Sequence, residues 1–307
     1  MVDIPFERDM DFVQGEAQQV TPLIRRLVAP NPSAFTFRGT NTYIVGHGKG
    51  VAVIDPGPDD DAHLEAILRT IAGDQVSHII VTHTHADHSP LAARLKQATG
   101  APTVAFGPHG AGRREAEGLA SGSVQLDASG DTEFQPDLRI EHGEVIDGAG
   151  WHLEAVFTPG HTSNHMAFAL LEEKALFSAD HVMAWSTSVI SPPDGNMADY
   201  MASLRALLER EDEVYWPGHG PEKTDPRPFV RAFIAHRQMR EQAIYKRILE
   251  GDRRVMDIVR QVYRTTDPKL HPAAAMSALA HIEHLIHLGK VRASGPLGHE
   301  TDYFPAD

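Results

Sequence analysis

The chain has 307 residues and a formal net charge of −14, which is long enough for one large domain or for one large and one small domain. Its apolar fraction of 41% and charged fraction of 23% are typical of a soluble globular protein. It contains no cysteine and no apolar stretch that could span a membrane, which excludes disulfides, thiolate metal ligands and a transmembrane protein. The first residues lack a secretion signal pattern, so we expect a cytoplasmic protein without a membrane partner.

The charge is divided unevenly along the chain. Residues 222–307 carry 14 Lys and Arg against 11 Asp and Glu, a net charge of +3, so residues 1–221 carry −17. The acidic part would repel a polyanion such as RNA, whereas the C-terminal part could tolerate one. Charge therefore favours a small substrate, and RNA stays open as an alternative partner.

Apolar and amphipathic runs predict the elements of the first 224 residues. The predicted strands cover residues 22–29, 41–45, 50–55, 76–81, 103–106, 140–144, 151–157, 166–171, 175–177 and 214–216. The predicted helices cover residues 59–72, 90–98 and 196–210. Residues 107–130 are rich in Gly, Ala and Ser and show no clear period, so no element is predicted there.

The character of the chain changes near residue 225. Three helices are predicted in succession, at residues 229–249, 255–263 and 272–288, and residues 289–298 resemble a hairpin. Helices followed by a small hairpin are typical of a winged-helix-type unit. We therefore predict two domains, residues 1–224 and residues 225–307.

Three histidines and one aspartate lie within six positions, in the run Thr-His-Thr-His-Ala-Asp-His at residues 82–88. They follow a predicted buried strand and precede a Ser-Pro pair that suits the start of a helix. His83 and His85 alternate, so they can point to one place, while Asp87 and His88 can turn to a second place nearby. Imidazole and carboxylate groups suit Zn, Mn or Fe. This run predicts a centre for two metal ions.

Three later strand ends also carry a His or an Asp. His161 follows the strand at residues 151–157, Asp180 follows the strand at residues 175–177, and His219 follows the strand at residues 214–216. Binding sites are commonly assembled where the strands of a layered sheet end. We therefore expect these three side chains to join the run at residues 82–88.

The chain resembles the metallo-β-lactamase fold superfamily in these motifs. The run at residues 82–88 matches its main signature, and His161, Asp180 and His219 match its later ligand positions in order. Asp55 before Pro-Gly matches its early turn and is expected to brace the metal loop through hydrogen bonds. The resemblance covers about residues 20 to 222 and implies an α+β fold, a four-layer αββα sandwich, here followed by the small, mainly helical winged-helix-like domain.

The resemblance also implies a ligand set. The first metal would be held by His83, His85 and His161, the second by Asp87, His88 and His219, and Asp180 would bridge them. The bridging carboxylate and the lack of cysteine resemble the glyoxalase II, ribonuclease Z and lactonase branches. The runs at residues 39–43 and 236–241 resemble a branch of metallo-β-lactamase-like endoribonucleases. The expected cofactors are two divalent ions, zinc first, with manganese or iron as alternatives.

The implied reaction is hydrolysis by a metal-bridging hydroxide, with Asp87 or Asp180 orienting the nucleophile and accepting its proton. We expect a small ester, thioester or lactone as the substrate. Three alternatives remain open: a metal-dependent endoribonuclease acting on single-stranded RNA, a nucleic-acid-binding module in which the metal domain is a scaffold, and an oxidative iron enzyme. An oligomer is also open.

Four further residues are predicted to contact the substrate. His165 lies four residues after His161, Tyr200 lies near the start of a predicted helix, and His236 and Arg237 lie on the first C-terminal helix. Residues 186–194 could form a lid over the site. The spaced histidines His281, His284 and His287 look like a metal stripe, but apolar neighbours favour a packed helix face.

Overall fold

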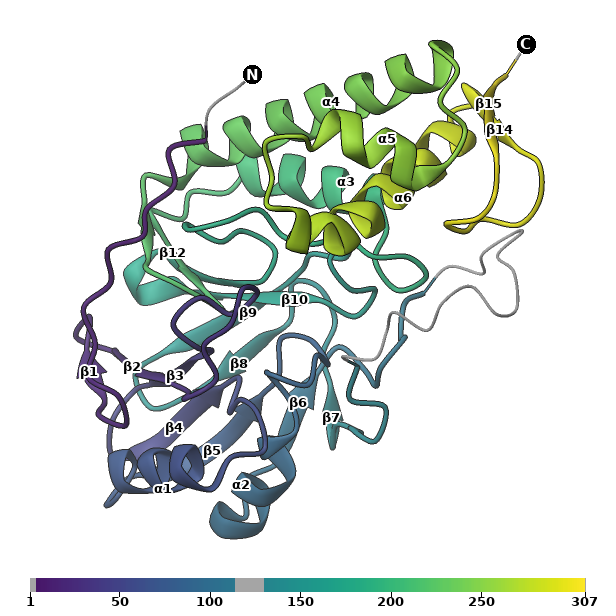
Figure 1. The fold of residues 1–307 in the computed structure, drawn as a ribbon. Helices are drawn as coiled ribbons and strands as arrows, with labels where there is room; N and C mark the ends of the chain where they lie inside the picture. The colour runs from purple at the N-terminus through teal and green to yellow at the C-terminus, as the bar shows by residue number, and fades with distance from the viewer. Residues whose placement is uncertain (1–3, 114–129, 307) are drawn as a thin grey trace.

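A computed structural model describes residues 4–113 and 130–306 of the chain. Two sheets lie face to face, with helices on the outer side of each (Figure 1). The predicted αββα sandwich is confirmed, and a mainly helical part with a small hairpin follows it. Most of the segment without a predicted element, residues 114–129, lies outside the described residues.

The first sheet has seven strands in chain order, and its last four strands, β4 to β7, run parallel. Parallel strands need crossover connections, and helices supply the first two of them, α1 (Asp61–Thr70) and α2 (Leu91–Thr99). The strands are β1 (Gln18–Gln19), β2 (Ile24–Val28), β3 (Asn41–Val45), β4 (Lys49–Ile54), β5 (Gln75–Ile80), β6 (Thr103–Ala105) and β7 (Leu138–Arg139). The helices bury apolar side chains such as Ile67 and Leu95 against the outer face of this sheet.

The second sheet has six strands in the order β13-β12-β11-β10-β9-β8. Its strands are β8 (Val145–Asp147), β9 (His152–Phe157), β10 (Met166–Leu170), β11 (Ala175–Ala179), β12 (Val214–Pro217) and β13 (Lys223–Thr224). The connection between the parallel strands β11 and β12 contains α3 (Met197–Leu208). The core between the sheets contains Trp151, Phe168 and Phe177, all at most 1% exposed.

The C-terminal part contains α4 (Pro226–Leu249), α5 (Val255–Val262), α6 (His271–His287) and the hairpin of β14 (Val291–Ala293) and β15 (Tyr303–Pro305). Helix α4 contributes side chains to two hydrophobic cores. Phe229 and Phe233 in its first half pack with α3 in the sandwich, whereas Ile244 and Ile248 pack with α5 and α6. The division into residues 1–224 and 225–307 stays a prediction.

Two sequence predictions differ from the structure. Residues 140–144 do not form a strand, because Gly143 adopts a positive φ of 84° in an exposed turn between β7 and β8. The predicted hairpin at residues 289–298 begins with β14, but its second strand is β15, beyond a longer connection. Among the described residues, no helix is both long and apolar enough to cross a membrane.

Glu283 on α6 gives a pH-dependent contribution to stability that can be tested. Burial, and then the charge of Asp199, raises the pKa of this carboxyl to about 7. The folded state therefore binds the proton more tightly than the unfolded state, so this contribution is complete below about pH 4.5 and is lost as the pH rises through about 7.

We expect Glu283→Gln to exceed the wild type in free energy of unfolding by about 1–2 kcal/mol at pH 8.5 and by much less at pH 5. Urea unfolding at both pH values measures the difference. The exposed Glu65→Gln on α1 is the matched control and should differ little from the wild type at either pH. An equal effect of Glu283→Gln at both pH values would contradict the prediction.

Candidate metal centre

Four strand ends deliver histidine and aspartate side chains to one edge of the sandwich. The loop after β5 carries the run at residues 82–88, and the turns after β9, β11 and β12 supply the remaining side chains. The side chains brought together are His83, His85, Asp87, His88, His161, Asp180 and His219. These are the seven ligands predicted from the sequence, and all of them fall into groups that could hold a metal ion.

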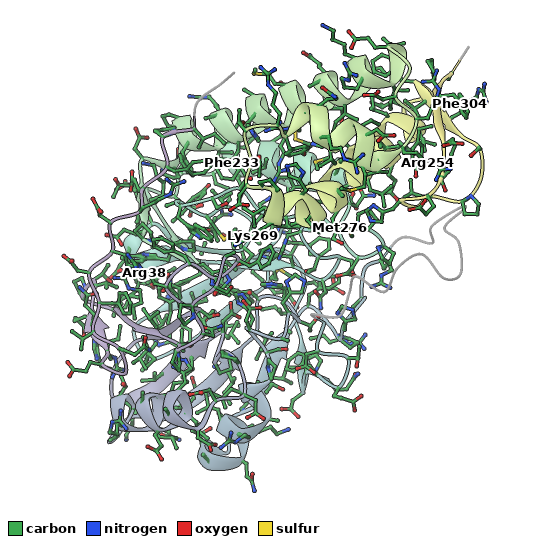
Figure 2. The ribbon with its side chains drawn as sticks, in the orientation of Figure 1. Arg38, Phe233, Arg254, Lys269, Met276 and Phe304 are labelled. Atoms are coloured by element: carbon green, nitrogen blue, oxygen red, sulfur yellow. The ribbon has the colours of Figure 1, made fainter. Side chains whose placement is uncertain are left out.

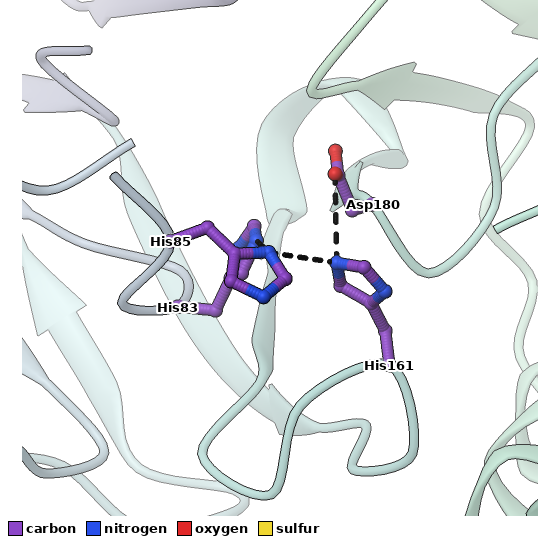
Figure 3. Close-up of side chains that lie close together, drawn as sticks. All are labelled: His83, His85, His161 and Asp180. Carbon is purple, nitrogen blue, oxygen red and sulfur yellow. Dashed lines mark hydrogen bonds and ion pairs between the residues drawn. The ribbon is translucent and has the colours of Figure 1, made fainter. Parts of the chain in front are cut away.

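The first group consists of three imidazoles and one carboxylate (Figure 3). Nδ1 of His85 lies 3.0 Å from Nε2 of His83 and 3.1 Å from Nε2 of His161. Two nitrogens bound to one tetrahedral zinc ion lie about 3.3 Å apart, given bonds of about 2.0–2.1 Å. Oδ2 of Asp180 lies 3.6 Å from Nε2 of His161. The donor set and its spacing fit a divalent cation.

The second group consists of Asp87, His88 and His219. Oδ2 of Asp87 lies 3.1 Å from Nε2 of His219 and 3.6 Å from Nε2 of His88. Asp180 lies between the two groups, with Oδ1 at 3.6 Å from Nε2 of His88 and Oδ2 at 3.4 Å from Nε2 of His219. Nε2 of His88 and Oδ1 of Asp180 are buried without a hydrogen-bond partner among the described residues. Such atoms are costly unless a cation binds them, so these residues also fit a metal ion.

The two groups differ in electrostatics. Burial lowers the pKa of His83 well below its usual value and that of His85 to about 4, so both are neutral and can bind a cation at neutral pH. Burial acts in the same direction on His219, but Asp180 and Asp87 raise its pKa to about 9. The carboxylates likewise raise the pKa of His88 well above its usual value against the effect of burial. The second group therefore has an excess of negative charge, which a divalent cation would balance.

Neighbouring hydrogen bonds fix the orientation of the side chains. Oδ1 of Asp55 accepts from the backbone N–H of Thr82 at 2.8 Å, and Oδ2 accepts from Nδ1 of His88 at 2.9 Å. These contacts agree with the expected bracing role of Asp55. Nδ1 of His161 donates to the carbonyl of Val189 at 2.7 Å, which leaves Nε2 free for a ligand. A backbone carbonyl has no sequence signature, so this contact could not have been found from the sequence.

Five of the seven candidate ligands line a cavity of about 620 Å³: His85, Asp87, His161, Asp180 and His219. Apolar side chains from three distant parts of the chain form much of the remaining wall: Phe35 from the loop before β3, Met183 and Trp185 after β11, and Met276 from α6. The loop at residues 186–194 contributes Thr187, Val189 and Asp194, among others, and its role as a lid stays a prediction. Figure 2 shows Met276 on the helix that faces the sandwich.

The four predicted substrate contacts lie outside this cavity. His165 and Tyr200 are completely buried, and Arg237 is only 3% exposed. His165 accepts or donates a hydrogen bond at Nδ1 with the Thr158 hydroxyl, whereas His236 lies within 3.4 Å of the Arg240 guanidinium. None of the four is among the described residues that line the cavity, and their substrate roles stay predictions.

Two of the three spaced histidines on α6 pack against one carboxylate of α4. His281 is buried and His284 is partly buried, and Nδ1 of each lies within 3.3 Å of Oε2 of Glu241 on α4. His287 is exposed. Among the described residues, these side chains do not form a group suited to a metal ion.

Comparison with known proteins shows the family to which the chain belongs. Residues 35–219 match the model of the metallo-beta-lactamase superfamily, and residues 255–298 match that of the beta-lactamase associated winged helix domain. The chain belongs to the metallo-β-lactamase superfamily. The suspected relationship is confirmed, as is the prediction, at the level of the family, of a metal-dependent hydrolase.

Individual relatives match this superfamily member over three quarters of its length or more. The Beta-lactamase-like protein 2 homolog of Drosophila melanogaster is 30% identical over 90% of this chain and 92% of its own length. An atrochrysone carboxyl ACP thioesterase of Cryptosporiopsis sp. (strain 8999) is 30% identical over 75% of this chain, which spans 64% of that protein. A beta-lactamase domain protein from Burkholderia ambifaria has the same fold, with a TM-score of 0.80, 22% identity and 96% coverage of both chains.

Proposed function

We propose that the chain is a binuclear metal-dependent hydrolase of small esters, with thioesters of apolar acyl groups as the preferred substrates. The observation that carries this proposal is the cavity, which is lined both by candidate metal ligands and by Phe35, Met183, Trp185 and Met276. A pocket of this size with apolar walls and a few polar groups is typical of a small-molecule site. The name of the fungal thioesterase, a relative with 30% identity, supports the same class of reaction.

The proposed ligand set is the one stated above. His83, His85 and His161 would hold the first cation, and Asp87, His88 and His219 the second, with Asp180 between them. Zinc is the proposed metal, because imidazole and carboxylate ligands at this spacing suit it, and manganese and iron use similar ligands. When bound, two such cations polarise a substrate carbonyl and activate water.

In the proposed hydrolysis, the two carboxylates and the apolar walls of the cavity would have different roles. Asp87 lines the cavity and is the more exposed of the two predicted catalytic carboxylates, at 26% against 9% for Asp180. Asp87 would orient the attacking water and accept its proton. Asp180 would hold the two groups of ligands at a fixed separation. The apolar walls would bind the acyl group and exclude bulk water.

The test is metal analysis of the purified protein followed by assays on one panel: an acyl thioester, a lactone, a β-lactam and a single-stranded RNA. We expect metal-dependent turnover that is fastest on the thioester. No Lys or Arg is among the described residues that line the cavity, so it offers no basic side chain to bind the phosphates of RNA. Preferential cleavage of RNA would overturn the substrate proposal, and full activity without metal would overturn the mechanism.

Met276 gives a test of where the acyl group binds. Met276→Trp adds bulk to the cavity wall, so we expect kcat/KM for a long-chain acyl thioester to fall by about 10-fold or more, as a clash of about 1.4 kcal/mol predicts. The value for an acetyl thioester should change by less than about 3-fold. The control is Leu288→Trp at the exposed end of the same helix, which should affect neither substrate. An equal fall in kcat/KM on both thioesters would show that the acyl group does not bind next to Met276.

A further inference from the structure

A short segment between β11 and α3, residues 188–190, contacts two of the proposed metal-binding strand ends. The Val189 carbonyl accepts the hydrogen bond from Nδ1 of His161 at 2.7 Å. The Ser188 hydroxyl donates to the carbonyl of Asp180 and lies 3.1 Å from the carbonyl of His181. The position of this segment therefore sets the orientation of His161 and the backbone that carries Asp180.

Both long C-terminal helices hold the same segment. On α4, Nη2 of Arg237 donates to the Ser188 carbonyl at 2.5 Å. On α6, the Ser277 hydroxyl accepts from the backbone N–H of Ile190 at 3.5 Å, a long contact. Tyr200 on α3 completes the support, because its hydroxyl lies 3.4 Å from the Ser188 hydroxyl. The segment is thus enclosed between the metal centre and the C-terminal helices.

Arg237 is an unusual residue for a purely structural contact. Its guanidinium is 3% exposed and lies 5.1 Å from the centre of the Tyr200 ring. Nε is buried without a hydrogen-bond partner, and no carboxylate within the described part of the chain forms a salt bridge with it. Burying an arginine without a counter-ion is costly, and an apolar side chain would fill the space at a lower cost. Its donation to the Ser188 carbonyl and its contact with the Tyr200 ring offset part of this cost.

We propose that Arg237 is a positioning residue for the metal centre, acting through residues 188–190 on His161. By fixing the Ser188 carbonyl, Arg237 holds the adjacent Val189 carbonyl in place, and that carbonyl orients His161 with Nε2 toward the first group. The C-terminal helices thereby control a ligand on the opposite side of the segment. The inference rests on the proposed metal site and adds the C-terminal domain to the residues that determine metal affinity.

The test compares Arg237→Gln with Arg240→Gln, a matched arginine three residues later on α4. Arg240 donates to the carbonyl of Val262 and stacks on Tyr263, so its contacts stay within the C-terminal helices. Metal affinity is measured by chelator competition, and ligand geometry by the visible absorption of the cobalt-substituted protein. We expect Arg237→Gln to weaken metal binding at the first group, which contains His161, by about 10-fold or more and to shift the cobalt bands. Arg240→Gln should do neither.

Two further variants separate positioning from a loss of folding. Arg237→Lys keeps one donor for the Ser188 carbonyl and should recover part of the metal affinity. Ser188→Ala removes the hydroxyl contact to the Asp180 strand end and should weaken metal binding even if Arg237→Gln does not fold. Equal metal affinities in Arg237→Gln and Arg240→Gln, or an unchanged affinity in Ser188→Ala, would overturn the inference. A wild-type protein that binds no metal would instead overturn the proposed function.

Discussion

Asp180→Asn is expected to reduce kcat/KM on the best thioester by about 1,000-fold or more, which equals about 4 kcal/mol of transition-state stabilisation. The reason is geometric, because the carboxylate of Asp180 lies between the two groups and close to nitrogens of both. Oδ1 lies 3.6 Å from His88, and Oδ2 lies 3.6 Å from His161 and 3.4 Å from His219. Replacing the carboxylate by an amide removes the negative charge and leaves one oxygen atom. The side chain could then no longer bind both cations.

Metal content measured by elemental analysis should fall from two ions per chain in the wild type to one or fewer in Asp180→Asn. The control is Asp212→Asn, a carboxylate that is 7% exposed and pairs with Arg210 away from the cavity. That variant should lose stability but keep both ions and, when folded, its activity. Two ions and normal turnover in Asp180→Asn would show that this carboxylate does not bridge.

Gly218→Ala is expected to disrupt the centre by adding a single methyl group. A Cβ at this position would lie 2.4 Å from Oδ1 of Asp180 and 2.8 Å from Cε1 of His88. Both distances are far inside van der Waals contact, so the carboxylate, the imidazole or the turn after β12 must move. We expect kcat/KM to fall by about 100-fold, in line with the loss seen when a metal site is displaced, together with weaker metal binding.

Gly295→Ala is the matched control, because a Cβ there meets no heavy atom within 4 Å. It should retain wild-type activity and metal content. Thermal unfolding with and without added zinc separates the two possible effects of Gly218→Ala. A variant that has lost the site should gain little stability from zinc, whereas the wild type should gain more. A normal zinc-dependent shift in Gly218→Ala would contradict the prediction.

The elements that the sequence predicts well are those with a strong local pattern. The long amphipathic runs that became α1, α3 and α4 and the buried runs that became β5 and β9 lie within a few residues of their predicted bounds. The failure at residues 140–144 has a local cause, since Gly143 forms a turn and Ile140 is the one apolar residue of the segment. The second strand of the C-terminal hairpin was missed because the Gly and Pro residues directly after β14 suggest a short turn, whereas residues 294–302 separate β14 from β15.

The four side chains of the run at residues 82–88 could be predicted because one loop after one strand carries them all. His161, Asp180 and His219 could be added because the end of a strand has a recognisable sequence, and the sheet order places those ends together. The substrate contacts could not be predicted in this way. Arg237 and Tyr200 have residue types that suit a binding site, but burial directs both into the protein interior.

The sequence by itself determined the fold family, the donor types of the metal centre and the chain segments that carry them, because these depend on short-range patterns and on the chemistry of His and Asp. Only the tertiary structure decided which side chains form the cavity wall and which carbonyl orients His161. Those contacts join Phe35, Val189 and Met276, which lie far apart in the chain. Apolar packing and backbone carbonyls have no motif of their own, so their partners are fixed only when the two sheets and the C-terminal helices come together.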